Sequence, residues 1–244
     1  MIYVLIAAAM VGGATVLGVV IGFRFERISV KMNNRILSLG AGVMLAAAIL
    51  GLVLPSMENG DILSLGITIA GIFTGALALS QLERLIPKLR QKWHKKTGAF
   101  NRGLLFVFAI AIHNLPEGIA AGVGFGGKEL SQAMMIAASI ALQNIPEGMV
   151  IITPMIRAGI HRKRALLYAL GTALIEIIGT FIGYTAVHLS TSVLPFALAF
   201  AGGTMLYVII DEMIPQTHSA FEKRDATYAA LIGFCLMLVF DAVL

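Results

Sequence analysis

Long apolar stretches separated by short polar segments dominate the sequence. A helix needs roughly 20 residues to cross a hydrocarbon core of about 30 Å, and eight stretches are long enough to do so. The charged residues gather between them. The pattern therefore predicts an all-α integral membrane protein with eight transmembrane helices, at residues 2–23, 37–56, 62–82, 104–125, 132–157, 165–189, 194–214 and 228–244.

The composition agrees with this pattern. Hydrophobic residues make up 58% of the chain and charged residues 13%, whereas about a quarter of the residues in a soluble domain are charged. The longest polar stretch, residues 83–102, is too short for a soluble domain, and no Gly-x-x-x-x-Gly-Lys-Ser/Thr pattern occurs. We expect a single polytopic membrane domain over residues 1–244. The single cysteine, Cys235, excludes an intramolecular disulfide and a cysteine metal cluster.

The basic residues predict the orientation. Seventeen of the eighteen Lys and Arg residues lie in the segments after the first, third, fifth and seventh stretches. Only Lys128 lies on the other side, where Glu58 and Asp61 make a loop acidic. Because short loops rich in Lys and Arg stay in the cytoplasm, both termini are predicted to face outward from the cell membrane. Topology explains the net charge of +5, so we expect a lipid bilayer and no nucleic acid as partner.

Two related motifs lie inside the fourth and fifth stretches. They read His-Asn-Leu-Pro-Glu-Gly at residues 113–118 and Gln-Asn-Ile-Pro-Glu-Gly at residues 143–148. At 3.6 residues per turn, each motif places its first residue and its glutamate on one helix face. Each proline also frees a backbone carbonyl about one turn earlier. If the two helices pack side by side, four donors that suit a divalent transition-metal ion converge: His113, Glu117, Gln143 and Glu147.

Other polar residues at membrane depth extend this prediction, since ionisable groups there usually mark an ion pathway. Glu176 has no Lys or Arg partner in its own helix, so a metal ion or a proton is its expected companion. Asn114 and Asn144 are candidate ligands, with capping of freed backbone groups or bridging of helices as the alternative. An exit relay, or alternatively a solvated helix end, is predicted at Asp211, Glu212 and His218.

These features resemble the ZIP (Zrt-, Irt-like protein) family of divalent-metal transporters, in particular its short bacterial branch. The resemblance covers the whole chain, including both motifs and the small-residue segments 40–46 and 201–207. It implies two metal positions that share Glu117 and Glu147. The first would be completed by His113 and Gln143, and the second by Asn114, Asn144 and Glu176. Many members carry His followed by an acid where this chain has Gln143-Asn144, so the second position is expected to be weak here.

The predicted function is therefore transport of divalent transition-metal ions toward the cytoplasm by an ATP-independent carrier. Zn²⁺ is the expected cargo, with Fe²⁺, Mn²⁺ and Cd²⁺ as alternatives. The ion would pass Met44, Ser56 and Glu58 and reach the site by alternating access. A divalent-metal channel is the main alternative. An intramembrane metallohydrolase is less well supported, because catalytic zinc usually has three firm ligands and the chain has no His-Glu-x-x-His. We expect no enzyme activity and no resident cofactor, and the sequence leaves a homodimer open.

Overall fold

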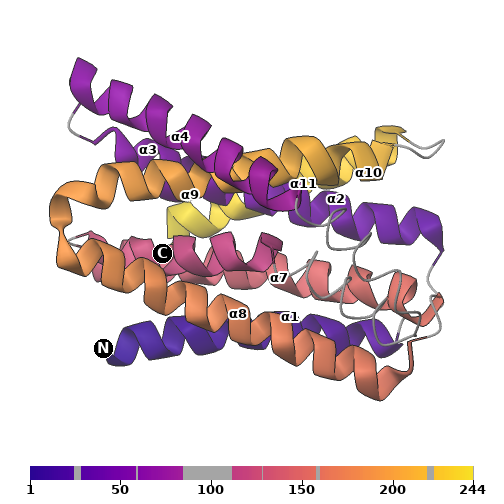
Figure 1. The fold of residues 1–244 in the computed structure, drawn as a ribbon. Helices are drawn as coiled ribbons and strands as arrows, with labels where there is room; N and C mark the ends of the chain where they lie inside the picture. The colour runs from indigo at the N-terminus through magenta and orange to yellow at the C-terminus, as the bar shows by residue number, and fades with distance from the viewer. Residues whose placement is uncertain are drawn as a thin grey trace.

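The protein is a bundle of helices that lie alongside one another (Figure 1). The computed structural model describes residues 1–24, 29–58, 60–84, 112–127, 129–157, 160–218 and 223–243. Within these ranges the chain is helical apart from short connections and contains no strand, which confirms the all-α prediction. Seven of the described helices are long and apolar enough to cross a membrane.

The helices have the following bounds, in chain order: α1 Ile2–Arg24, α2 Val30–Ala46, α3 Leu54–Ser56, α4 Ile62–Glu83, α7 Leu130–Arg157, α8 Arg162–Leu189, α9 Leu194–Val208, α10 Ile214–His218 and α11 Lys223–Val243. A further helical segment covers residues 112–123. The fourth predicted span, 104–125, lies partly outside the described residues, as does most of the polar stretch 83–102. The number of spans therefore stays a prediction.

Several helices begin before the predicted apolar stretch. Helix α2 starts at Val30 rather than near residue 37, and the side chain of Ser29 caps it by accepting a hydrogen bond from the Met32 amide at 3.2 Å. Helix α8 starts at Arg162, where His161 is the capping residue. A hydropathy pattern detects only the part of a helix suited to hydrocarbon, so polar first turns that extend beyond it are missed.

Two helices widen just before a proline. The stretches Ala47–Val53 and Ile209–Met213 are π-helical. The amide of Leu54 donates to the Ile49 carbonyl, and that of Ile214 to the Ile209 carbonyl, both five residues back. Pro55 and Pro215 follow at once. A proline ring clashes with the carbonyl four residues earlier, and the wider turn relieves that clash.

Burial is inverted relative to a soluble protein. Large apolar side chains are exposed on the outside, such as Phe73 at 71%, Leu174 at 57% and Val239 at 62%. By contrast, Glu117 and Glu176 are at most 1% exposed. An apolar surface around a polar interior fits a lipid surrounding. The protein is thus a multi-pass membrane protein.

Candidate metal site

The motif glycines bring two other helices against the site. A Cβ atom at Gly118 would lie 2.2 Å from the backbone oxygen of Glu176 on α8, and one at Gly148 would lie 2.5 Å from that of Thr15 on α1. No side chain fits at such distances, so only glycine allows this approach. The glycines of the two Pro-Glu-Gly sequences therefore allow α8, at Glu176, and α1, at Thr15, to pack directly against the motif helices.

Glu176 lies at the centre of a polar cluster and is fully buried. Its Oε1 accepts hydrogen bonds from Thr15 Oγ1, at 2.8 Å, and from Asn114 Nδ2. Its Oε2 accepts from Thr15 Oγ1, at 2.9 Å, and from Asn144 Nδ2, at 3.2 Å. Donors from three other helical segments thus satisfy this carboxylate, and both motif asparagines point their amide nitrogens toward it.

The glutamate of the first motif meets the glutamine of the second. Gln143 Nε2 donates to Glu117 Oε1 at 2.8 Å, and both side chains are buried. Glu147 is partly buried on α7. The charge of Glu117 interacts with those of Glu147 and Glu176, so three carboxylates lie close together. The two motif helices thus meet at Glu117 and Gln143, while the convergence of all four predicted donors on one ion stays a prediction.

Four buried oxygen atoms of this cluster have no hydrogen-bond partner among the described residues: Asn114 Oδ1, Glu117 Oε2, Gln143 Oε1 and Asn144 Oδ1. An unsatisfied buried acceptor costs about 1–3 kcal/mol, and native structures keep few of them. All four are lone-pair acceptors, and the nearby amide and hydroxyl donors already bond to the carboxylates of Glu117 and Glu176. Such a set fits a divalent cation, which replaces the missing donors and offsets the negative charge.

A second cluster contains His113. Ligand atoms of Glu83, His113 and Glu212 lie within 4.8 Å of one another, and His113 Nε2 is 3.2 Å from Glu212 Oε2. Glu83 Oε1 and His113 Nδ1 are buried without a partner in the described part of the chain. Tyr207 donates to Glu83 Oε2 at 3.1 Å. His113 thus lies against Glu83 of α4 and Glu212 of the π-helical stretch. Its contact with an ion held by Glu117 stays a prediction.

The structure places the three residues predicted for the exit relay differently. Glu212 belongs to this second cluster. Asp211 is exposed and accepts a hydrogen bond from the Tyr207 hydroxyl at 3.4 Å. The side chain of His218 lies outside the described part of the structure. The role of all three stays a prediction.

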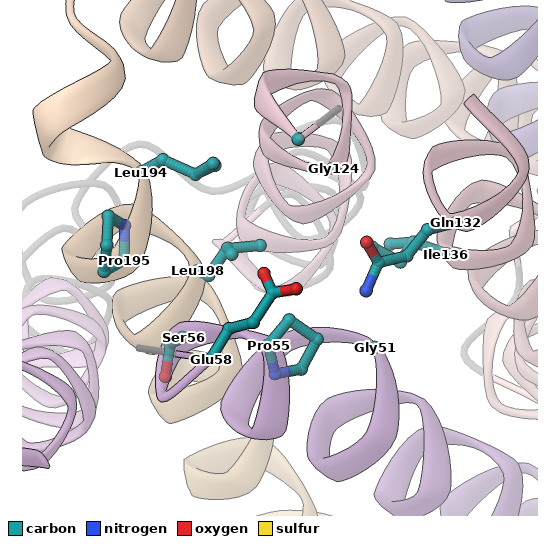
Figure 2. A pocket seen from close by; sticks show the side chains of 11 residues that line it. Gly51, Pro55, Ser56, Glu58, Gly124, Gln132, Ile136, Leu194, Pro195 and Leu198 are labelled. Atoms are coloured by element: carbon teal, nitrogen blue, oxygen red, sulfur yellow. The ribbon is translucent and has the colours of Figure 1, made fainter. Parts of the chain in front are cut away.

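A cavity of about 160 Å³ lies among α3, α7, α9 and the 3₁₀ turn Gly124–Gly126. Figure 2 shows the Glu58 carboxylate and the Gln132 amide pointing into the same space from opposite walls. Ser56 also lines it. Met44, the third residue predicted along the access route, is instead 2% exposed within the apolar core.

Three residues of these sites were not predicted from the sequence. Thr15 is one threonine in an apolar helix, and Glu83 and Gln132 lie near the ends of theirs. Nothing local distinguishes Glu83 or Gln132 from solvated helix ends. For Thr15 a signal exists: Gly12 and Gly18 lie one turn on either side, and such small-residue faces mark close helix packing.

Fold and site together define a multi-pass membrane protein with unpaired oxygen atoms in its interior. The profile of the ZIP zinc transporter family matches residues 92–241. Zinc transporter GufA of Myxococcus xanthus is 37% identical over 97% of this chain and 97% of its own length. Zinc transporter ZIPB of Bordetella bronchiseptica is 32% identical over 99% of the chain and 81% of its own. Zinc transporter ZupT of Chlorobaculum parvum is 29% identical over 96% and 94%.

The chain therefore belongs to the ZIP family of zinc transporters. This confirms the predicted class, a divalent-metal transporter and not an enzyme. It leaves the ligand residues, the cargo and the direction of transport as predictions.

Proposed function

We propose that the protein carries Zn²⁺ toward the cytoplasm, and that the ion binds among Glu117, Gln143, Glu147 and the motif asparagines. The observation that carries this proposal is the set of four unpaired buried oxygen atoms beside clustered carboxylates. The cargo is inferred from the relatives, which are named zinc transporters.

The proposed path of the ion passes three groups of polar side chains. Glu58 and Gln132 receive the ion in the outer cavity. The central oxygens then replace its water ligands. His113, whose ring lies one helical turn from Glu117, passes the ion to Glu83 and Glu212 on the way to the cytoplasm. Polar groups that line a buried path in this order lower the barrier for a hydrated dication.

One ion dominates at the centre. Glu176 already accepts three donors, from Thr15, Asn114 and Asn144, so little of its lone-pair capacity is left. The second position implied by the resemblance would share Glu117 and Glu147 with the first. It is therefore weak or filled only in transit, as Asn144 in place of an acid also suggests.

In the proposed mechanism, alternating access results when two groups of helices move as rigid bodies relative to each other. In one, α1 packs on α7 and α8; in the other, α2 packs on α11 and α4 on α9. Inside each group, glycines bring backbones together: a Cβ at Gly42 would lie 1.9 Å from the Ala230 oxygen. Across the boundary the packing is looser: a Cβ at Gly40 would lie 3.4 Å from the Pro146 side chain and 3.9 Å from the nearest backbone atom, the Gln143 oxygen. Side-chain contacts slide more easily than interlocked backbones.

The topology proposed is eight spans with both termini outside. Both ends of the chain lie at the same end of the bundle (Figure 1), and a chain that begins and ends on one side crosses an even number of times. The helix at 112–123 would supply the eighth crossing. The distribution of Lys and Arg supports the outward orientation of that side.

The test is zinc uptake into proteoliposomes that contain the purified protein. A carrier should show saturable uptake that is accelerated when zinc is preloaded inside, because a returning loaded site reorients faster than an empty one. A channel would show no such acceleration. Uptake that neither saturates nor responds to preloaded zinc would contradict the proposed carrier, and a panel of Fe²⁺, Mn²⁺ and Cd²⁺ would establish the cargo.

A further inference from the structure

Helix α1 touches the central site through Thr15. Its side chain is 2% exposed, and its hydroxyl lies 2.8 Å and 2.9 Å from the two oxygens of Glu176. A single hydroxyl proton at similar distances from both oxygens is shared between them. Thr15 therefore faces the middle of the carboxylate and fixes the plane in which it lies.

The orientation of Glu176 in turn decides that of both motif asparagines. Oε1 accepts from Asn114 and Oε2 from Asn144, so each carboxylate oxygen holds one amide. In a planar amide the oxygen points away from the nitrogen. With their nitrogens held at Glu176, Asn114 and Asn144 direct their oxygens elsewhere, and these oxygens are buried and unpaired.

The same helix also holds Asn144 directly. The carbonyl of Val11, one turn before Thr15, accepts from Asn144 Nδ2 at 3.3 Å. Gly148 lets the backbones approach, since a Cβ there would lie 2.5 Å from the Thr15 carbonyl. The hydroxyl is thus held in register with the site by backbone packing rather than by a flexible side chain.

The geometry points to Thr15 as a positioning residue for metal binding: through Glu176 it turns the oxygens of Asn114 and Asn144 toward the transported ion. This inference rests on the proposed function. Groups beyond the first ligands commonly set the orientation of those ligands and thereby the affinity of the site. Thr15 touches no ion itself, so its loss should weaken binding without removing a ligand.

The test replaces the hydroxyl while keeping the shape. Thr15→Val should raise the KM for zinc uptake about three- to tenfold, the range expected when one ordinary intramolecular hydrogen bond is lost, with kcat changed less than KM. Thr15→Ser, which keeps the donor, should return the KM to within about twofold of wild type. Zinc affinity in detergent, measured by calorimetry, should follow the same order.

Thr180, one turn after Glu176 on α8, provides a matched control. Thr180 is also fully buried, but its hydroxyl donates to the backbone oxygen of Glu176 at 3.0 Å rather than to the carboxylate. Thr180→Val should therefore leave the KM near the wild-type value. Equal KM values for Thr15→Val and Thr180→Val would overturn the inference, even if the wild type carries zinc and the proposed function stands.

Should Thr15→Val not insert, the comparison of Thr15→Ser with Thr15→Ala still isolates the hydroxyl, because both residues are small. Serine must then have the lower KM; identical values would contradict a positioning role. A wild-type protein that carries no divalent metal would overturn the proposed function and this inference together.

Discussion

At the scale of single residues, the amide side chains distinguish this site. Gln143 offers an oxygen where an imidazole would be a stronger donor for a borderline metal such as Zn²⁺. Its Nε2 bonds to Glu117, which leaves its Oε1 unpaired and buried. If Gln143 is a ligand, its amide oxygen binds zinc more weakly than an imidazole would, which favours release during transport.

Replacing Gln143 with histidine should tighten the site. Gln143→His adds a neutral imidazole nitrogen next to Glu117, so zinc affinity by calorimetry should rise and the preference should shift away from Mn²⁺. Leu142→Ala, on the exposed face of the same helix, serves as the control. Unchanged affinity and unchanged preference would show that residue 143 is not directed at the ion.

A second residue-scale prediction concerns Asn144. Asn144→Asp would add a fourth carboxylate, and attraction between charges a few ångströms apart is several kcal/mol even at an effective dielectric near 20. Under the same loading, elemental analysis should find more zinc per protein than in the wild type. If neither stoichiometry nor affinity changed, Asn144 would be structural and the two-ion interpretation should be dropped in favour of one central ion.

The candidate residues at the centre follow from the sequence, because the Pro-Glu-Gly motifs repeat and helical spacing puts the donors of each motif on one face. The contact of Glu117 with Gln143 depends in addition on how the two helices pack. Thr15 and Glu83 could not be predicted in this way. Their roles depend on which helices pack together, and that is decided by glycine contacts between segments far apart in the sequence.

At the scale of elements, helix ends were harder to predict than helix centres. The apolar pattern located α4 well because its cap, Asp61, directly precedes the apolar run. It missed the first turns of α2 and α8, which are polar. The π-helical stretches were also not predicted, because a proline in a helix indicates a disturbance without specifying its form.

The cap of α4 yields a pH prediction. The Ser64 amide donates to Asp61 Oδ1 at 2.8 Å, and this bond lowers the pKa of the Asp61 carboxyl below its usual value. A lowered folded-state pKa adds stability above the unfolded pKa, and that stability is lost as the pH falls through the folded value. Asp61→Ala should therefore lower the melting temperature in detergent at pH 7.

The difference between Asp61→Ala and wild type should shrink as the pH falls from about 5 to about 3, the range in which an aspartate takes up its proton. Asp61→Asn keeps a capping oxygen without a charge, so its stability relative to Asp61→Ala should not vary over that range. A melting difference of the same size at pH 7 and pH 3 would count against the charged cap.

At the scale of the whole molecule, the proposed movement requires two groups of helices that pack more tightly within each group than against each other. Gly42 is in contact with α11 inside one body, whereas Gly40 on the same helix faces the other body. Adding a methyl group at these two positions should therefore have different effects. Hydropathy predicts the number of spans, including the eighth crossing, but it does not predict how the spans pack.

Gly42→Ala should destabilise the protein by about 1–3 kcal/mol or more, the cost of overpacking, because the new Cβ would meet the Ala230 carbonyl. Gly40→Ala should fold normally, since its Cβ would make an ordinary contact with Pro146 at 3.4 Å. Melting curves in detergent check both. Equal destabilisation by the two variants would argue against a boundary between α2 and α7.

If the buried oxygens around Glu117 hold the transported ion, zinc uptake by Glu117→Gln in proteoliposomes will show it. The variant keeps the shape of the side chain but loses the charge, so uptake and zinc binding should both be abolished in a correctly inserted protein. Glu129→Gln, at an exposed glutamate outside the site, should behave as wild type. Wild-type uptake by Glu117→Gln would show that the Glu117 carboxylate does not hold the ion.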